Sequence, residues 1–278
     1  MTSRLNRVLD VLEAFADGTS VLSAEQICTR AGTPIATGYR HIRELCDAGL
    51  MVRLPHGYAP GPRIIEWDYM VRSHDPMLLA ARELVDELAA DTGLELLLSQ
   101  LYGERIVNVH YAHHAGNAVL DFGRGRVLPL FRGSSSRVIL AALPTRKLRA
   151  LFEAHRDHPD LAAWEGDWKR FAKAHAEVRK RGYAISRGEM HTDRVGLAAP
   201  IFVGSGPEAG GGSAGGHVLG SLTVIGTTAR VEAFREDYLS RRVVETAAAI
   251  SRRIALEEPA RQARPTNGTR GDHEHRPS

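Results

Sequence analysis

Apolar residues recur at helical spacing through the first fifty positions of the chain, and turn residues separate the repeats. The apolar face of the first helix consists of Leu5, Val8, Leu9, Leu12 and Phe15. Ser23 and Gln26 predict a capping box at the start of a short second helix, because their side chains can satisfy backbone groups of its first turn. Thr33 is expected to cap a third helix that begins at Pro34 and runs to about Ala48. Two short helices joined by a tight turn predict a helix-turn-helix, whose second helix enters the major groove of DNA.

A wing and a linker are predicted directly after the third helix. Two short strands surround the turn Pro55-His56-Gly57, at 50–54 and 57–59. A strand pair in this place is typical of a wing, so residues 1–62 are interpreted as a winged helix-turn-helix. Pro60-Gly61-Pro62 then breaks the chain, and residues 63–76 are expected to form a linker helix.

From about residue 76 the pattern alternates between helices and strands. A helix is expected from Pro76 to just before Gly93. Strands are predicted at 94–101, 105–111, 118–122, 183–187, 195–203 and 217–225, and helices at 134–142, 145–154, 167–181 and 231–256. This order indicates an α/β domain over residues 77–257 with a mainly antiparallel sheet, and it gives the chain an α+β class. Residues 258–278 are rich in Pro and Arg and are expected to form a disordered tail.

The composition is that of an ordinary globular protein, with 43% hydrophobic and 25% charged residues among 278. This length predicts two domains. No apolar run approaches the ~20 residues that cross a bilayer, and the start of the chain lacks the apolar core of a signal peptide. Cys28 and Cys46 are expected to be free, reduced thiols, so a cytoplasmic location is expected.

Basic residues gather in the second half of the first domain. Residues 1–29 contain two basic and four acidic side chains, whereas residues 30–63 contain five basic and two acidic ones. The inner face of the third helix is predicted to carry Gly38, Ile42 and Leu45, which leaves the opposite face free. The candidate DNA-binding residues are Thr33, Thr37, Tyr39, Arg40, Arg43, Arg53 and His56, of which Thr37 and Arg40 are expected to touch bases. The alternative is a solvated face on a three-helix module that binds protein.

A candidate anion site lies at the start of the helix predicted at 134–142. The first turn of a helix offers free N–H groups and a partial positive charge, which attract a carboxylate or phosphate. Four arginines flank this start, namely Arg124, Arg126, Arg132 and Arg137, with Asp121 against them. An anionic ligand is therefore one interpretation, and simple serine capping beside solvated arginines is the other.

Several short phrases of the chain match, in order, a family of bacterial regulators. They are Arg7-Val8-Leu9-Asp10-Val11-Leu12, Tyr39-Arg40-His41-Ile42-Arg43-Glu44-Leu45, Gly57-Tyr58-Ala59-Pro60-Gly61-Pro62-Arg63, Leu128-Pro129-Leu130, Arg181-Gly182-Tyr183 and Leu197-Ala198-Ala199-Pro200-Ile201. On these phrases and on the order of its elements, the chain resembles the IclR family of transcriptional regulators from Leu5 to about Leu256. It departs from that family at Asp193 and Gly196, where a Gly and often a Cys are usual. It also has an insertion at 204–216 with seven glycines.

The resemblance implies a GAF-like effector-binding domain, in which residues 132–137 line the effector pocket and residues 188–193 form its other wall. The candidate effector-binding residues are Leu128, Leu130, Arg132, Ser134, Ser135, Ser136, Glu189, Asp193, Leu197 and Ile201, of which the four apolar ones are expected to form a wall of the pocket. Glu189 and Asp193 either orient ligand hydroxyls or water, or are loop carboxylates that face solvent. The implied function is a ligand-responsive regulator of a catabolic operon, with operator DNA and a small organic acid as partners. Aromatic acids are among the candidate effectors, and a homodimer or homotetramer is expected.

Two other functions have weaker support. His110, His113 and His114 suggest a metal-sensing regulator, but strand alternation sends His110 and His113 to opposite faces. A hydrolase that used a serine from 134–136 would need a triad signature, which the sequence lacks. Residues 210–215 match GxGxxG in letters only, because a strand rather than a helix follows them. No enzymatic activity, metal or cofactor is therefore expected.

Overall fold

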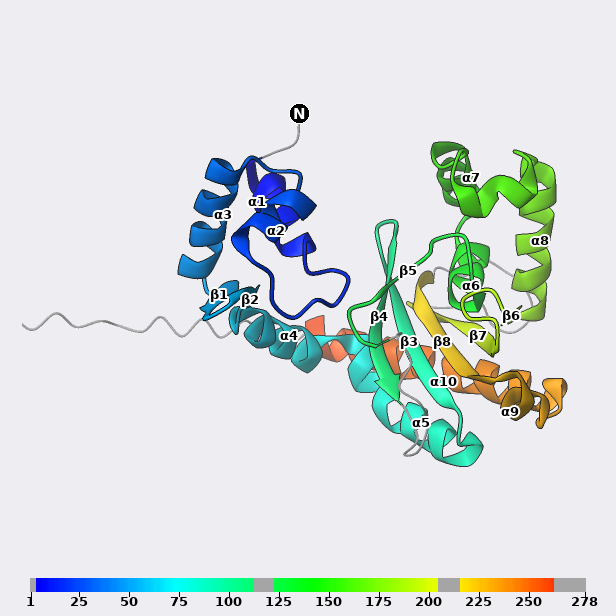
Figure 1. Ribbon diagram of the computed structural model, residues 1–278. Coiled ribbons are helices and arrows are strands. Elements are labelled where there is room, and N and C mark those ends of the chain that lie inside the picture. The colour runs from blue at the N-terminus through cyan, green and yellow to red at the C-terminus, as the bar shows by residue number, and fades with distance from the viewer. Residues whose placement is uncertain (1–3, 113–122, 205–215, 263–278) are drawn as a thin grey trace, which may run out of the picture. The chain divides into compact units, whose positions relative to one another are not determined.

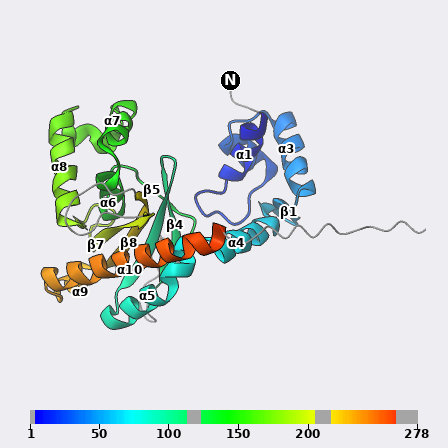
Figure 2. The ribbon, with the colours of Figure 1, turned by 180° about the vertical axis from the view of Figure 1, so that it is seen from behind.

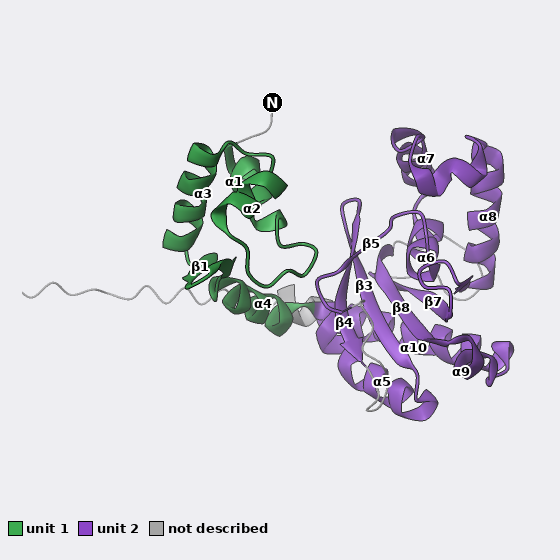
Figure 3. Ribbon diagram, viewed as in Figure 1, with its two compact units in different colours: residues 1–75 green, residues 76–278 purple. Residues whose placement is uncertain are grey.

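The computed structural model describes residues 4–112, 123–204 and 216–262, with side chains described as far as Glu257. The chain forms two compact units, Met1–Asp75 and Pro76–Ser278 (Figure 3). Each unit has a hydrophobic core of its own.

The first unit is a winged helix-turn-helix followed by a further helix (Figure 1). Its elements are α1 (Arg4–Glu13), α2 (Ala24–Arg30), α3 (Ile35–Asp47), β1 (Met51–Leu54), β2 (Gly57–Pro60) and α4 (Arg63–His74). β1 and β2 pair as an antiparallel hairpin. The core of this unit consists of Val11, Ala14, Phe15, Leu22, Ala24, Ile27, Ile42, Leu45 and Met51. The helix-turn-helix and the wing predicted from the sequence are thus confirmed.

The two helix starts differ in how well the sequence predicted them. The capping box of α2 is present, because Ser23 Oγ accepts the N–H of Gln26 (3.3 Å) and the Gln26 side chain accepts the N–H of Ser23 (2.8 Å). The predicted cap of α3 is wrong. Pro34 is extended (ψ 139°) and occupies the N-cap position, so the helix begins one residue later. Thr33 therefore lies outside the helix, and its hydroxyl donates to the carbonyl of Ala31 (3.3 Å).

In its described residues, the second unit is a six-stranded antiparallel sheet with helices on both faces (Figure 1, Figure 2). The strand order is β5-β4-β3-β8-β7-β6, formed by β3 (Glu95–Tyr102), β4 (Arg105–Ala112), β5 (Val127–Leu128), β6 (Ala184–Arg187), β7 (Arg194–Val203) and β8 (His217–Thr227). One face is covered by α5 (Pro76–Thr92) and α10 (Glu236–Gln262). On the other face, α6 (Ser134–Ala142) packs against β7 and β8. The predicted α+β class and antiparallel sheet are confirmed.

The remaining helices of this unit are α7 (Thr145–Ala154), a short 3-10 helix (Pro159–Trp164), α8 (Trp168–Arg181) and α9 (Thr228–Glu232). The helix predicted at 231–256 is in fact two helices, because Thr227 caps α9 and α10 starts again at Glu236. α10 continues to Gln262, so residues 258–262 are helical although they were assigned to the disordered tail. The two-residue strand β5 was not predicted. The strand predicted at 118–122, most of the glycine-rich insertion and residues 263–278 lie outside the described residues.

Alternation along the central strands assigns their side chains to the two faces of the sheet. In β7, Leu197, Ala199 and Ile201 belong to the core that α5 and α10 form with the sheet. Ala198, between them, packs with Val138 of α6 on the other face. Thr223 of β8 also faces α6, because its hydroxyl lies 2.7 Å from Ser135 Oγ. The space between α6 and the sheet is therefore bounded by the even positions of β7 and the odd positions of β8.

Candidate DNA-binding surface and effector cavity

The outer face of α3 presents the basic residues expected there. Gly38, Ile42 and Leu45 are buried as predicted, and so is His41. Arg40 is exposed and makes no hydrogen bond or ion pair with any residue that the structure describes. Thr37 is half-buried one turn before it. Arg40 is therefore free to reach a ligand outside the unit.

Tyr39 has a structural partner that the sequence did not reveal. Its hydroxyl donates to Glu25 Oε1 of α2 at 2.7 Å. This hydrogen bond raises the pKa of Tyr39 and lowers the pKa of Glu25. The phenol thus links the two helices of the helix-turn-helix, and its hydroxyl is already engaged.

Three further candidates remain accessible. Arg43 is exposed and lies 3.9 Å from Asp47, an ion pair that solvent screens. Arg53 in β1 and His56 in the turn between β1 and β2 are both exposed. Arg40, Arg43, Arg53 and His56 are therefore the exposed nitrogen-bearing side chains of the predicted DNA-binding set, and the half-buried Thr37 has no hydrogen-bond partner within the described residues.

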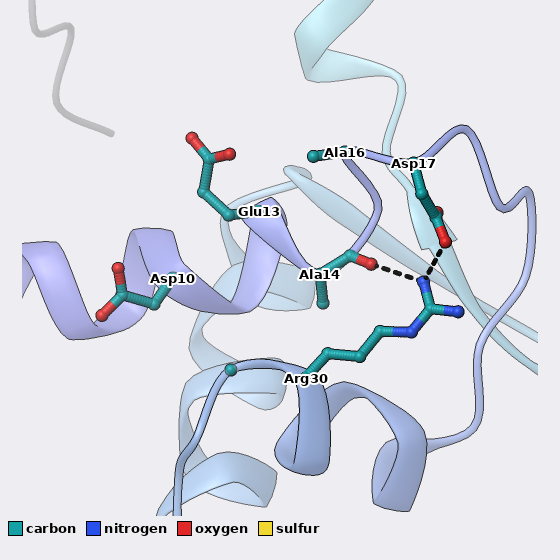
Figure 4. A pocket seen from close by; sticks show the side chains of 7 residues that line it. Asp10, Glu13, Ala14, Ala16, Asp17 and Arg30 are labelled. Atoms are coloured by element: carbon teal, nitrogen blue, oxygen red, sulfur yellow. Dashed lines mark hydrogen bonds and ion pairs between the residues drawn. The ribbon is translucent and has the colours of Figure 1, made fainter. Parts of the chain in front are cut away.

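Two of the five basic residues in 30–63 stabilise the fold instead. Arg30 donates to the carbonyl of Ala14 (2.9 Å) and to Asp17 (2.8 Å), which joins α2 to the end of α1. Figure 4 shows these bonds at the edge of an open hollow that Asp10 and Glu13 also line. Arg63 donates to the carbonyl of Ala48 (2.8 Å), directly after α3. The basic surface is consequently smaller than the count of charges indicated.

In the second unit, a cavity lies between the start of α6 and the sheet. It is lined by Leu97, Leu128, Arg132, Gly133, Ser134, Ser135, Ser186, Met190, Arg194, Gly196, Thr223 and Ile225. Leu128, Arg132, Ser134 and Ser135 were among the predicted effector-binding residues. The cavity volume is about 40 Å³, which holds about three water molecules and is too small for an aromatic acid.

The serines at the start of α6 have three different environments. Ser135 is hydrogen-bonded to Thr223 across the cavity floor. Ser136 is fully buried and donates to the carbonyl of Pro129 at 2.6 Å, so it does not line the cavity. Ser134 is 4% exposed and has no hydrogen-bond partner in the described parts of the chain. Because Ser134 lines the cavity, its hydroxyl is open to a polar group that enters there.

Gly196 creates the space in front of Ser134. A Cβ at this position would lie 2.8 Å from Ser134 Oγ and 3.2 Å from Ser186 Oγ. Ser186 is itself buried and, within the described residues, has no hydrogen-bond partner. Gly196 was noted in the sequence only as a departure from the family pattern. The structure shows what its missing side chain provides, a gap bordered by two hydroxyls.

Two arginines line the cavity. The Arg194 side chain is 17% exposed and lies 4.0 Å from the buried Glu95 and 3.5 Å from Asp193. Arg132 is more exposed and lies 3.7 Å from Asp160. Each guanidinium therefore keeps donors that a carboxylate in the cavity could use.

Several predicted effector contacts are elsewhere. Leu197 and Ile201 point to the opposite face of the sheet, because β7 places alternate residues on opposite sides. Leu130 packs with the core that α7 and α8 form. The Asp193 carboxylate is exposed. The Glu189 carboxylate accepts hydrogen bonds from the N–H of Gly133 and from Arg137.

The metal-sensing alternative gains no support from the structure. The described residues contain no group of three or more His, Cys, Asp or Glu side chains that could hold a metal ion. His110 lies in β4, whereas His113 and His114 are outside the described residues. In the same described residues, no helix is both long and apolar enough to span a membrane.

Comparison with known proteins gives the family. Residues 70–252 match the model of the C-terminal domain of the bacterial transcriptional regulator IclR, and residues 5–55 match the IclR helix-turn-helix domain. The HTH-type transcriptional regulator KipR of Bacillus subtilis (strain 168) is 23% identical over 234 residues, which cover 84% of this chain and 90% of KipR. These matches are to transcriptional regulators, not to enzymes.

Solved structures agree with these matches. A putative IclR regulator from Silicibacter sp. TM1040 superposes with a TM-score of 0.66 at 27% identity, and the match covers 91% of this chain and 96% of that one. An IclR homologue from Microbacterium hydrocarbonoxydans, complexed with 4-hydroxybenzoate, has a TM-score of 0.70 at 20% identity and covers 91% of this chain and 99% of its own. With both of its domains matched, this chain belongs to the IclR family of bacterial transcriptional regulators.

Proposed function

We propose that this regulator binds its operator as a symmetric homo-oligomer and that a small organic acid in the α6 cavity controls that binding. The observation that carries the effector assignment is the unpartnered hydroxyl of Ser134, a largely buried residue that lines the cavity at the N-terminus of α6, with Arg194 in the same lining. Helix N–H groups, a free hydroxyl and a guanidinium together form an environment that favours a carboxylate. The regulated genes are proposed to belong to a catabolic operon, and the protein is proposed to act in the cytoplasm.

The DNA contacts are assigned from the exposed basic side chains of the first unit. Arg40, at the centre of the free face of α3, is proposed to read a base edge in the major groove. Arg43, Arg53 and His56 are proposed to contact phosphates or the minor groove beside it. Phosphate contacts contribute to affinity for any sequence, whereas a base contact discriminates between sequences.

The proposed oligomer uses the apolar surface of α4. This helix has no buried residue, and Ile65 and Tyr69 are 72% and 73% exposed. Trp67, Met70 and Val71 of the same helix are exposed as well. Contiguous exposed apolar surface of this kind marks an interface in a soluble protein, and a second copy of this chain is the proposed occupant.

An aromatic acid is the leading effector candidate, since a structural relative was solved with 4-hydroxybenzoate. Its ring would need the apolar side chains of Leu97, Leu128 and Ile225 for contact. The present cavity is too small for this ring, so binding requires the cavity to enlarge. A change of this kind can shift the protein between DNA-competent and incompetent states, provided that the ligand prefers one of them.

Titration calorimetry tests the effector assignment. Benzoate and 4-hydroxybenzoate are compared with benzamide, which has the same ring and no charge. We expect the acids to bind at least tenfold more tightly than benzamide, and Arg194→Ala to remove most of this difference. The control is Arg146→Ala, which changes an exposed arginine of α7. Equal binding of acid and amide would contradict the assignment.

DNA titrations test the assignment of α3. Arg40→Ala should lose about 1–3 kcal/mol of operator affinity and relax the sequence preference, whereas Arg43→Ala should weaken binding to all sequences alike. Arg146→Ala again serves as control. If the folded Arg40→Ala protein bound its operator as tightly as the wild type, α3 would not be the reading helix.

A further inference from the structure

We infer that Glu189 is a resident carboxylate that keeps the effector cavity closed, and that an anionic effector opens the cavity by taking its place. The inference rests on the proposed function and adds how the site is regulated. It differs from both sequence-based interpretations, in which Glu189 either contacts the effector directly or faces solvent.

Glu189 occupies the kind of position that an effector carboxylate would take. Its Oε2 accepts the backbone N–H of Gly133, the N-cap residue of α6, at 3.0 Å. Arg137, in the first turn of α6, donates to both carboxylate oxygens at 2.7 and 2.9 Å. The positive end of the helix and one guanidinium are therefore neutralised by the chain itself.

The loop that carries Glu189 also covers the cavity. Met190 lines the cavity and packs on Gly133. A Cβ added to Gly133 would lie 3.6 Å from the Cγ and 3.7 Å from the Sδ of Met190. Gly188, just before Glu189, has a φ of 66°, which a glycine adopts without strain. The bonds of Glu189 thus hold Met190 against the start of α6, and their loss would free both residues together.

The interior of the cavity supplies the reason for a ligand to enter. Ser134, next to Gly133, is more than nine-tenths buried and its hydroxyl lacks a partner in the described structure. A ligand carboxylate could satisfy Ser134 and offer Arg137 and Gly133 the negative charge that Glu189 now provides. A neutral ligand cannot replace that charge, so Glu189 would select for anions as well as close the site.

The direction in which one substitution changes benzoate affinity separates this role from direct effector contact. Glu189→Gln keeps the length and shape of the side chain but removes its charge, which weakens the closed state. If Glu189 competes with the effector, the variant should bind benzoate about tenfold more tightly than the wild type, a difference of about 1.4 kcal/mol. If Glu189 contacts the effector, or only supports the fold, the variant should bind benzoate more weakly.

The experiment measures benzoate and benzamide binding by calorimetry on the full-length wild type, Glu189→Gln and Glu153→Gln. Glu153→Gln is the matched control, because Glu153 forms an exposed ion pair with Arg149 of the same helix, α7. We expect the gain in affinity for benzoate in Glu189→Gln alone. Unchanged or weaker benzoate binding by Glu189→Gln would overturn the inference, as would the absence of benzoate binding by all three proteins.

Hydrogen exchange on the same proteins gives a readout that a general loss of stability would not mimic. Without ligand, Glu189→Gln should raise exchange at residues 188–193 and at Gly133, and leave the core strand β8 protected. Benzoate should raise exchange of the same loop in the wild type. Protection of the loop in both cases would overturn the inference, whereas operator binding that depends on Arg40 would still support the proposed regulator function.

Discussion

Gly38→Ala probes how closely the two helices of the helix-turn-helix approach. A Cβ at Gly38 in α3 would lie 2.2 Å from Cys28 Sγ in α2. Nonbonded heavy atoms prefer about 3.5–4.0 Å, so either the Cys28 thiol must turn away or the two helices must separate at this point. Cys28 is 2% exposed, which leaves its sulfur little room to move.

The expected change in the free energy of unfolding is the difference between a gain in helix propensity and a cost of overpacking. Alanine in a helix interior is more favourable than glycine by about 1 kcal/mol. Overpacking in a well-packed core costs about 1–3 kcal/mol. We therefore expect Gly38→Ala to lower the free energy of unfolding of the first unit by up to about 2 kcal/mol, and to weaken operator binding because α3 is displaced.

A double-mutant cycle with Cys28→Ala isolates the contact. Urea unfolding followed by circular dichroism is measured for the wild type, both single variants and the double variant. Cys28→Ala removes the sulfur, so Gly38→Ala should become neutral or stabilising in that background, with a coupling free energy of about 1–3 kcal/mol. A coupling near zero, or a Gly38→Ala protein more stable than the wild type, would refute the close approach of α2 and α3.

Two further predictions concern the second unit. Burial lowers the pKa of His175 below its ordinary 6.5, so the unfolded chain takes up a proton before the folded one as the pH falls. The free energy of unfolding should therefore decrease as the pH falls below 6.5. Urea titrations between pH 5 and 8 should show that His175→Gln flattens this dependence. An unchanged dependence of the free energy of unfolding on pH would contradict the burial of a neutral imidazole. Gly196→Ala should reduce benzoate affinity at least tenfold, because the added methyl group fills the gap beside Ser134. Gly123→Ala, whose methyl group meets open space, should leave the affinity unchanged. Equal benzoate affinity of the two variants would place the ligand elsewhere.

Local signals in the sequence were sufficient to predict the helices and strands of the first unit. The capping box at Ser23 and the turn residues between helices act within a few positions, so they could be read directly. The wrong cap at Thr33 was predicted because Thr and Pro both favour a helix start. Only the backbone conformation shows which of the two residues occupies the N-cap position of α3. The roles of Arg30 and Arg63 could not be predicted, since each bonds a carbonyl about fifteen positions away.

The effector cavity was predicted only in part, for a different physical reason. β7 is buried on both faces and carries the apolar run Val195-Gly196-Leu197-Ala198-Ala199. A strand of this kind shows no alternation of polar and apolar residues, so its orientation could not be read from the sequence. Leu197 was consequently assigned to the cavity in place of Gly196. The pairing of Glu189 with Arg137 joins positions 52 residues apart, a separation at which sequence pattern carries no signal.

The most direct test of the account is a selection of DNA from a random-sequence duplex pool by the full-length protein, followed by titration of the enriched duplex with and without benzoate. The account predicts an inverted repeat, with half-sites about one helical turn or a multiple of it apart. It also predicts that affinity for this duplex falls steeply with salt and changes in the presence of benzoate. A pool without any enriched sequence would contradict the central claim that this chain is a ligand-controlled, DNA-reading regulator.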